Sequence, residues 1–480
     1  MKRIENLVRR RRQTKIVATV GPATESLEQI RTLFHAGVDV FRLNFSHDTG
    51  DIQGKRIDNI RTVEKETGRP IAILADLQGP KLRIGKFKDD QIALTKGMRL
   101  KLDSNPELGD ETRVCLPHPE IMKVLDKGAF VLLDDGKVRL EVVEKGPDFL
   151  IAEVVSGMYL SSRKGFNIPN VVLPVSSLTA KDKVDLDYAL QKNVDFIGLS
   201  FVQRPEDIIE ARKLINGKAS IIIKIEKPQA LECLDELIDL TDVVMVARGD
   251  LGVEIPMEDV PAIQKLIIRK CREAGKPVIV ATQMLESMIT SPMPTRAEAS
   301  DVANAIYDGT DAVMLSAETS AGKYPIEAVA MMSKIAEKTE KDELYQKFLH
   351  NYDPKLHNNA SDALTAAAKQ VAETIGSPTI ITYTTTGSTT LRASRERPQV
   401  PILCLAADPK IARKMVLAYG TFCAQVERFD SLRKMMEEGC RIAYENELAN
   451  IGDRVVITAG VPFGTPGSTN MIRISWIEKD

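Results

Sequence analysis

Short runs of β-branched and aliphatic residues alternate with longer amphipathic segments between about residue 15 and residue 345, and this alternation is the strongest constraint on the fold. The amphipathic segments have recognisable helix ends, since residues 25–36 stop at Gly37 and residues 261–274 stop at Gly275. Alternating strands and helices predict a parallel sheet, and eight strands predict its closure into a (β/α)8 TIM barrel. The predicted strands are 15–20, 40–46, 70–76, 195–202, 220–226, 242–250, 277–283 and 311–319.

Two segments depart from the barrel pattern. Residues 81–170 have turn signals between short apolar runs and no strong helix, which predicts an inserted all-β domain. Because this insert interrupts the barrel (1–80 and 171–345) after a strand, we expect it over the barrel mouth, with Gly79-Pro80 as a hinge that makes it a lid. Residues 346–480 return to alternation and predict a separate C-terminal α/β open-sheet domain.

The composition excludes several classes of protein. The net charge is −2, from 65 Lys and Arg against 67 Asp and Glu, so we expect no nucleic-acid partner. No apolar run is long enough to span a membrane, and the six cysteines form no C-x-x-C pair, so a cytoplasmic protein is expected. The residues 9–12 are four consecutive arginines, which can contact phosphate, although a short solvated arm is the commoner outcome.

Polar residues end most of the predicted barrel strands, where a strand has no structural need for them. All carboxyl ends of parallel barrel strands lie on one face, which is where barrel enzymes keep their active sites. For a single strand, a solvated strand end or a helix cap is the favoured interpretation, whereas six such strands together favour an active site. The set is Arg42, Asn44, Ser46, His47, Asp76, Lys224, Glu226, Lys227, Arg248, Gly249, Asp250, Thr282, Gln283, Ser316, Glu318 and Thr319.

Glu226 and Asp250 come from adjacent predicted strands, so their carboxylates are candidates for a Mg²⁺ site, which takes one or two protein carboxylates. The alternative is a carboxylate pair bridged by Arg248 or Lys227. Lys224 shares a strand face with Glu226, and a lysine there neutralises charge on a transferring phosphoryl oxygen. A Schiff-base lysine is a weaker alternative, since two carboxylates keep the amine charged.

Other strand ends predict further contacts. Arg42 suits bidentate binding of phosphate. Asn44, Ser46 and Asp76 offer oxygen ligands for a hard cation, although each can equally cap a helix.

A run of hydroxyl residues in the C-terminal domain lies between a predicted strand and a helix, which favours phosphate binding but also fits a Thr-rich helix start. Residues 452–472 supply a second Gly-rich loop that can close over the same ligand. No Walker A motif and no dinucleotide-binding G-x-G-x-x-G are present, which argues against a Rossmann dehydrogenase. The run is Thr384, Thr385, Thr386, Gly387, Ser388 and Thr389.

Nine segments, taken in order, resemble the pyruvate kinase family over nearly the whole chain. The resemblance implies a barrel, a lid and a C-terminal effector domain, usually in a homotetramer. It also implies Mg²⁺-dependent (or Mn²⁺-dependent) phosphoryl transfer from phosphoenolpyruvate to ADP, which gives pyruvate and ATP. The segments are 14–24, 41–47, 76–81, 163–169, 221–227, 244–256, 281–288, 294–319 and 467–474.

The resemblance also assigns roles to single residues. Lys224 is similar to the lysine that stabilises the phosphoryl-transfer transition state, and Glu226 and Asp250 are similar to the Mg²⁺ ligands. Contacts to phosphoenolpyruvate are implied for Arg42, Lys224, Gly249, Asp250 and Thr282, with Thr282 beside the carbon that gains a proton. Nucleotide contacts are implied for Asn44, His47, Arg83 and Lys164.

Many relatives bind K⁺ at positions matching Asn44, Ser46, Asp76 and the carbonyl of Leu77. Potassium-dependent members have a glutamate where this chain has Lys81. A lysine ammonium there supplies positive charge itself, so we predict weak or absent K⁺ dependence. The alternative is that Lys81 is a solvated hinge residue.

Two other functions stay open at this point. One is a different phosphoenolpyruvate or enolate barrel enzyme, which the lid with Arg83 and Lys164 disfavours. The other is a catalytically silent sensor of a sugar phosphate. The effector itself is open between fructose 1,6-bisphosphate, another sugar phosphate and AMP, although Arg392, Arg395 and Arg397 follow the hydroxyl run and can add positive charge.

Overall fold

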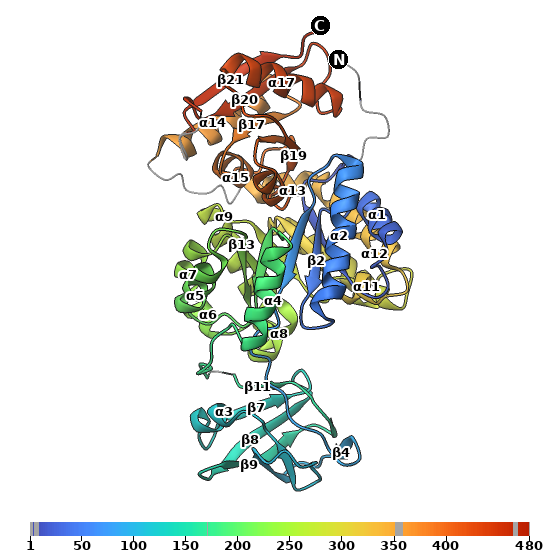
Figure 1. The fold of residues 1–480 in the computed structure, drawn as a ribbon, viewed down its shortest axis with the longest axis vertical. Helices are drawn as coiled ribbons and strands as arrows, with labels where there is room; N and C mark the ends of the chain where they lie inside the picture. Colours follow the sequence, from blue (N-terminus) through green and yellow to red (C-terminus); the bar gives the residue numbers. More distant parts are fainter. Residues whose placement is uncertain (1–2, 4–8, 170, 351–358, 464–468, 480) are drawn as a thin grey trace.

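A computed structural model describes residues 3, 9–169, 171–350, 359–463 and 469–479. Three bodies follow one another along the long axis in Figure 1, with the insert at one end, the barrel in the middle and the C-terminal domain at the other end. This arrangement confirms the predicted fold class. In the described part of the chain, no helix has both the length and the apolar character needed to cross a membrane.

Eight parallel strands form a closed barrel in the order β1-β16-β15-β14-β13-β12-β3-β2. Their side chains are almost all buried, as expected for strands covered on both faces. One set of side chains fills the barrel interior and another packs against the surrounding helices. The strands are β1 (Lys15–Val20), β2 (Val40–Asn44), β3 (Ala72–Asp76), β12 (Phe196–Leu199), β13 (Ser220–Ile225), β14 (Val243–Ala247), β15 (Val278–Ala281) and β16 (Ala312–Leu315).

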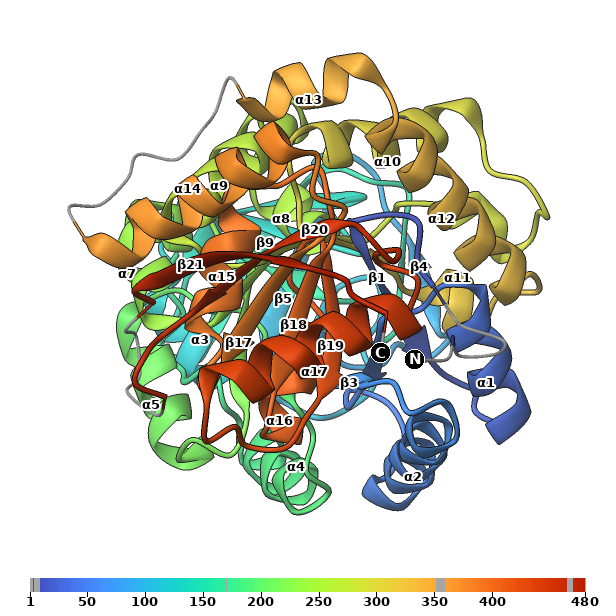
Figure 2. The same cartoon turned by 90° about the horizontal axis from the view of Figure 1, so that it is seen from above.

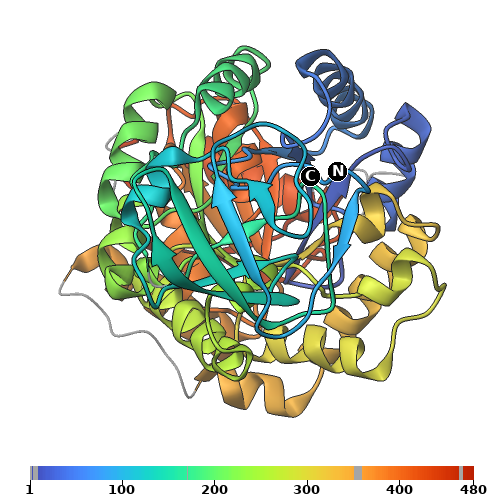
Figure 3. The same ribbon diagram turned by 90° about the horizontal axis from the view of Figure 1, so that it is seen from below.

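Helices surround the barrel, as Figures 2 and 3 show from its two ends. Ser26, Thr179 and Thr295 begin helices with reciprocal capping boxes, and Gly37 and Gly275 end helices with positive φ. The long helices are α1 (Leu27–Ala36), α2 (Gly50–Thr67), α4 (Ala180–Gln191), α5 (Pro205–Ile215), α9 (Val260–Ala274), α10 (Arg296–Tyr307) and α12 (Pro325–Glu340). Shorter elements are α6 (Gln229–Glu232), α7 (Leu234–Leu240), α8 (Arg248–Glu254), α11 (Ala317–Ser320), α13 (Glu343–His350) and the 3₁₀ turns Met257–Asp259 and Glu286–Ile289.

The insert leaves the barrel after β3 and returns before α4, which places it over the carboxyl ends of the barrel strands (Figure 3). It has a hydrophobic core of its own, built around a six-stranded sheet in the order β11-β7-β8-β9-β5-β6. One short helix that the sequence pattern did not predict, α3 (Pro119–Val124), lies beside this sheet. The strands are β4 (Gln91–Ala93), β5 (Arg99–Asp103), β6 (Arg113–Cys115), β7 (Phe130–Leu133), β8 (Val138–Lys145), β9 (Phe149–Ser156), β10 (Tyr159–Ser161) and β11 (Phe166–Asn167).

The C-terminal domain is an open five-stranded sheet in the order β19-β18-β17-β20-β21, with only β21 antiparallel among the described strands. It sits against the amino ends of the barrel strands, where Leu417 packs on the side chains of the barrel interior. Ion pairs Arg397–Asp311 (2.8 Å) and Arg413–Glu64 (2.7 Å) join the two domains. Its elements are α14 (Ala360–Ile375), β17 (Ile380–Thr384), α15 (Ser388–Arg395), β18 (Ile402–Ala406), α16 (Pro409–Met415), β19 (Thr421–Gln425), α17 (Leu432–Glu445), β20 (Arg454–Ala459) and β21 (Met471–Trp476).

Candidate active site at the mouth of the barrel

Lys224 lies at the centre of a charged cluster at the carboxyl end of the barrel. It is the fifth residue of β13, and its Nζ is 2.8 Å from Glu226 Oε1 and 3.7 Å from Asp76 Oδ2. The same ammonium donates a hydrogen bond of 3.0 Å to Ser200 Oγ, which in turn donates to the carbonyl of Leu77. Three strands therefore contribute to the position of one ammonium group.

Arg42 and Asp76 form the second part of this cluster. Nε and Nη2 of Arg42 both lie 2.7 Å from Asp76 Oδ2, and Nη1 donates to Thr19 Oγ1 at 3.0 Å. The neighbouring strand has Gly198 beside this carboxylate, where a Cβ atom would come within 2.8 Å of Asp76 Oδ1. A glycine at this point lets the buried Asp76 fit between strands while holding two cationic side chains.

The electrostatics of the cluster follow from burial and from its close charges. Burial alone would lower the pKa of Lys224, but Asp76, Glu226 and Asp250 raise it above its ordinary value, so the amine stays charged. This agrees with the low rank given to a Schiff-base role. Burial raises the pKa of Asp76 less than Lys224 and Arg42 lower it, and the net pKa lies below the usual value.

Glu226 is short of positive charge despite its contact with Lys224. Burial raises its pKa to about 7, and the Asp250 carboxylate adds to the rise while Lys224 opposes it. Its Oε2 accepts a hydrogen bond of 2.7 Å from the backbone amide of Phe201. A further cation next to Glu226 and Asp250 would relieve this shortage.

A divalent cation fits these residues by their chemistry. Glu226 and Asp250 offer hard carboxylate oxygens. Within the described ranges no cluster of three His, Cys, Asp or Glu side chains could hold a metal ion, so the protein would supply two carboxylates and leave the other coordination positions open. Two carboxylates and no thiol or imidazole favour Mg²⁺ or Mn²⁺, which complete their coordination with water and substrate oxygens. The bridging alternative is not what the structure has, because Arg248 pairs with Asp301 at 2.7 Å and Lys227 with Glu254 at 2.9 Å.

Thr282 and Gly249 border the cluster on the side of β14 and β15. The Gly249 amide donates to Thr282 Oγ1 at 2.7 Å, and Arg248 Nη2 donates to the Thr282 carbonyl at 2.8 Å. Thr282 has φ of 70°, a left-handed conformation that is strained for a β-branched residue and is often found at functional sites. These contacts fix the direction of its hydroxyl.

One local prediction about this region was wrong. The sequence pattern put 248–250 at the end of a strand, but β14 ends at Ala247 and these residues form the first turn of α8. Likewise, Glu318 and Thr319 belong to α11 and not to a strand. Hydrophobic runs give the buried part of a strand but not the point where the chain turns into a helix.

The residues expected to bind a monovalent cation make hydrogen bonds of their own. Asn44 Oδ1 accepts from the Ser46 amide at 3.1 Å, and the Leu77 carbonyl accepts from Ser200. Asp76 Oδ1 is buried and has no hydrogen-bond partner in the described part of the chain. The Lys81 ammonium lies 4.0 Å from Asp250 Oδ1. The positive charge of Lys81 is therefore next to a candidate ligand of the divalent cation.

The expected nucleotide contacts form two groups. On the insert, Arg83 donates to the Arg163 carbonyl at 3.1 Å, and Lys164 pairs with Asp134 at 2.7 Å. Asn44 is the last residue of β2 and His47 follows this strand, and within the described residues neither makes a hydrogen bond or an ion pair with the insert. The insert nevertheless reaches the barrel mouth, because Asn167 donates to Glu254 of α8 at 2.8 Å.

The hydroxyl run of the C-terminal domain lies at the start of α15, in the body at the opposite end of the barrel from the mouth (Figure 1). Gly387 has φ of 95° and its amide donates to Thr384 Oγ1 at 2.9 Å. Arg392 and Arg395 both pair with Asp362, and Arg397 pairs with Asp311, so structural ion pairs hold all three arginines. Thr385 and Thr386 are exposed and Ser388 is partly exposed, while residues 464–468 of the second loop lie outside the described residues.

Sequence reasoning missed two side chains of the cluster, Ser200 and Thr19. Ser200 follows β12 as a polar residue at a strand end, which is the signal that selected its neighbours. Thr19 lies inside β1, and its contact with Arg42 depends on the strand register, where the two residues are paired.

Comparison with known proteins gives a consistent result. Residues 11–329 match the family model for the pyruvate kinase barrel domain, and residues 362–475 match that for the pyruvate kinase alpha/beta domain. The pyruvate kinase of Methylorubrum extorquens is 50% identical over 98% of this chain and 99% of its own length. That of Geobacillus stearothermophilus is 41% identical over 97% of this chain and 80% of its own.

A solved structure supports the same assignment. The crystal structure of a pyruvate kinase from Cryptosporidium parvum has a TM-score of 0.92 and 34% sequence identity, covering 97% of this chain and 96% of that one. One family model matches the barrel and the other matches the C-terminal domain, and the Methylorubrum extorquens relative aligns with both. The chain therefore belongs to the pyruvate kinase family.

Proposed function

We propose that this chain transfers a phosphoryl group from phosphoenolpyruvate to ADP with the help of Mg²⁺ or Mn²⁺, giving pyruvate and ATP (an ATP:pyruvate 2-O-phosphotransferase). The observation that carries the proposal is the Lys224 ammonium, which lies 2.8 Å from Glu226 and 3.7 Å from Asp76 at the barrel mouth. An ammonium group beside candidate ligands of a divalent cation can stabilise the negative charge of a phosphoryl group as it moves from phosphoenolpyruvate to ADP.

Glu226 and Asp250 would hold the divalent cation, which supplies positive charge to phosphoryl and enolate oxygens when bound. Lys224 and Arg42 contact the transferring phosphoryl group. Since the pKa of Lys224 is raised, it acts as a permanent charge and not as a proton donor. The positively charged side chains of Lys224 and Arg42 would hold the phosphoryl group in line with the attacking oxygen of ADP.

The second step is protonation of the enolate of pyruvate at carbon. Thr282 lies beside the Gly249 amide with its hydroxyl direction fixed, which supports a role next to the methylene carbon, with water as the proton carrier. Asp250 and Gly249 complete the substrate contacts. This protonation gives the ketone directly, and the stability of the ketone makes the transfer to ADP favourable.

The insert acts as the lid over the nucleotide. Arg83 and Lys164 on the insert and Asn44 and His47 on the barrel would meet the nucleotide phosphates when the lid closes. The present partner of Lys164 is Asp134, whose hydrogen bond raises the pKa of Lys164, and an incoming phosphate competes for that ammonium.

K⁺ dependence is proposed to be weak. The Lys81 ammonium lies 4.0 Å from Asp250. It would supply positive charge in place of the K⁺ that relatives bind through positions matching Asn44, Ser46, Asp76 and Leu77. The C-terminal hydroxyl run (384–389) would bind a phosphate-bearing effector, and the enzyme would be a homotetramer.

A coupled assay of pyruvate formation with phosphoenolpyruvate and ADP tests the proposal, with Mg²⁺ present or chelated. The native chain should turn over only with the cation, and Lys224→Met should lower kcat by about 100-fold or more. Lys218→Met, at an exposed lysine, serves as the matched control and should leave kcat unchanged. Pyruvate formation without ADP would favour another enolate enzyme, and ligand binding without any turnover would favour a sensor.

A further inference from the structure

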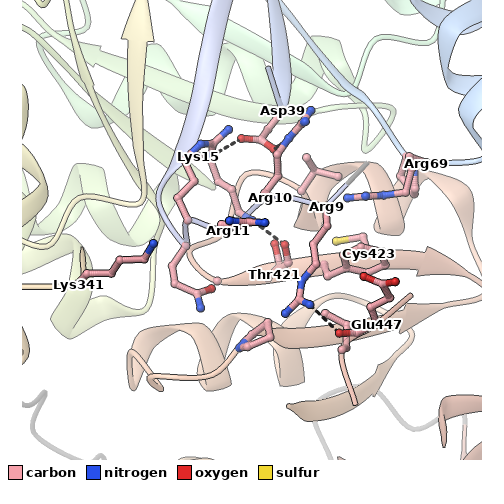
Figure 4. A pocket seen from close by; sticks show the side chains of 18 residues that line it. Arg9, Arg10, Arg11, Lys15, Asp39, Arg69, Lys341, Thr421, Cys423 and Glu447 are labelled. Carbon is pink, nitrogen blue, oxygen red and sulfur yellow. Dashed lines mark hydrogen bonds and ion pairs between the residues drawn. The ribbon is translucent and has the colours of Figure 1, made fainter. Parts of the chain in front are cut away.

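A cavity of about 590 Å³ lies between the amino end of the barrel and the C-terminal domain (Figure 4). Its walls come from the segment before β1, from the residues after α2 and α12, and from β19. It is at the end of the barrel away from the charged cluster around Lys224, and it has no lining residue in the 384–389 run. Its volume is in the range of small-molecule sites.

The arginine run 9–12 forms part of this cavity, contrary to the expectation of a solvated arm. Arg12 is buried, donates to the carbonyls of Thr14 and Gly37 and pairs with Asp39 at 2.8 Å. Arg9 donates to the Glu447 carbonyl at 2.6 Å. The arm folds down because buried carbonyls and a buried carboxylate give its guanidinium groups better partners than a short free segment has.

The cavity has far more positive than negative charge. Only two of its described lining residues carry carboxylates, Asp39 and Glu447. The Asp39 carboxylate already forms ion pairs with Arg12 at 2.8 Å and with Arg10 at 3.4 Å. Burial would raise the pKa of Asp39, but Arg12, Arg10 and Lys15 lower it to about 2. The seven cationic lining residues are Arg9, Arg10, Arg11, Arg12, Lys15, Arg69 and Lys341.

Two of these cations, Arg11 and Lys341, are exposed and have no ion pair or hydrogen bond with any residue that the structure describes. Lys15 is buried, and its Nζ donates to the Thr421 carbonyl at 2.6 Å with no carboxylate at ion-pair distance in the described ranges. Burial lowers the pKa of Lys15 to about 8 and that of Arg10 to about 10. Cations in this state are stabilised by an added anion.

The remaining walls are less polar. The Arg69 guanidinium lies 4.0 Å from the centre of the Phe422 ring, and Pro70, Pro401 and Val416 line the same space. The cavity thus has a cationic part and a less polar part, and a ligand with an anionic end and a compact uncharged body would fit both. Arginine guanidinium groups bind phosphate in a bidentate manner, which favours phosphate as the anionic end.

We infer that this cavity is a binding site for a small phosphate monoester, separate from the substrate site and from the C-terminal hydroxyl run. The phosphate contacts Arg11, Lys15 and Lys341, and the body of the ligand lies against Phe422. Because Lys15 and Lys341 belong to the barrel part of the chain and Phe422 to the C-terminal domain, a bound ligand ties the two domains together.

The test measures binding by calorimetry in the full chain with Lys224→Met and Ser388→Glu, which weaken phosphate binding at the other two candidate sites. The probes are inorganic phosphate, glucose 6-phosphate and AMP, with glucose and adenosine as matched probes without phosphate. The two phosphate esters should bind and raise Tm, and their unphosphorylated counterparts should not. Comparing the esters identifies the body that fits.

Arg11→Ala with Lys341→Ala should weaken binding of the better ester by about tenfold or more. Both side chains are exposed, so the free protein should keep its Tm. Lys213→Ala with Lys218→Ala, at two exposed lysines near the end of α5, is the matched control and should bind as before. Equal affinity in the Arg11 and Lys341 variant, or no binding of any probe at millimolar concentration, would overturn the inference. Since the readout is binding, it is independent of whether the proposed catalysis is correct.

Discussion

Arg42 and Lys224 approach the same oxygen of Asp76, at 2.7 Å and 3.7 Å, from the two sides of β3, since β2 is next to β3 and β13 is the second strand on its other side. The carboxylate thus offsets the repulsion between two cations and lets both lie close together at the barrel mouth. Its own pKa is lowered by their charges.

Asp76→Asn should therefore lower stability. The change leaves two partly buried cations without their shared buried anion, which should lower the free energy of unfolding by about 3 kcal/mol. Asp58→Asn removes an exposed pair with Lys192 and should change it by less than about 1 kcal/mol. Urea unfolding of both variants checks the difference, and a wild-type midpoint for Asp76→Asn would contradict it.

Glu226→Gln should weaken binding of the divalent cation. The amide keeps the shape of the side chain but removes a negative charge, so the Mg²⁺ concentration for half-maximal activity should rise by about 10-fold or more. Glu236→Gln, at an exposed carboxylate, is the control and should leave that concentration unchanged. An unaltered Mg²⁺ titration for Glu226→Gln would show that the ion is held elsewhere.

Lys81→Glu should make activity depend on K⁺. The native chain is expected to keep most of its activity when a bulky organic cation replaces K⁺, because the Lys81 ammonium is already present near Asp250. The glutamate variant should lose activity without K⁺ and recover when K⁺ is added. A native enzyme that is strongly activated by K⁺ would refute the role given to Lys81.

Thr282→Ala should slow turnover without preventing binding of the cation. The change removes the hydroxyl that accepts from the Gly249 amide and that is proposed to lie beside the protonated carbon, and kcat should fall by about 100-fold. Thr282→Ser keeps the hydroxyl and should recover most of the activity. Comparable kcat values for the alanine and serine variants would exclude a role for the hydroxyl.

Lys15→Met should change how stability depends on pH. Burial lowers the pKa of Lys15 from 10.5 in the unfolded chain to about 8, so the folded protein binds this proton less tightly. Stability from this group is therefore fully present above pH 10.5 and is lost as pH falls toward about 8, by at most about 3 kcal/mol. As pH increases from about 8 to 10.5, the melting temperature of the native protein should rise relative to that of Lys15→Met. Parallel melting-temperature curves for the two proteins would contradict a buried charge at Lys15.

The strand cores and the charged cluster were accessible from the sequence because they follow simple rules. A buried parallel strand needs an uninterrupted apolar run, and a polar residue at its end stands out, as Lys224, Asp76 and Arg42 do. Fold class and family were confirmed. The roles given to single residues, the domain limits and the effector loop remain predictions.

Other features depend on contacts between distant segments, which a single sequence does not display. Asp250 lies on α8 and not at a strand end, because the turn from strand to helix is set by backbone geometry at 248–250. Arg12, which precedes β1, is buried because it pairs at 2.8 Å with Asp39, which precedes β2. The packing of Leu417 on the barrel interior joins residues separated by most of the chain.

Strand β1 has a consequence for communication between the two ends of the barrel. At the first residue of β1, the Lys15 ammonium donates a hydrogen bond to the Thr421 carbonyl of the C-terminal domain. Four residues later, the Thr19 hydroxyl accepts a hydrogen bond from Arg42. This strand is hydrogen-bonded on both sides, to β2 and to β16. A single short strand without a loop therefore connects the C-terminal domain to the guanidinium of Arg42.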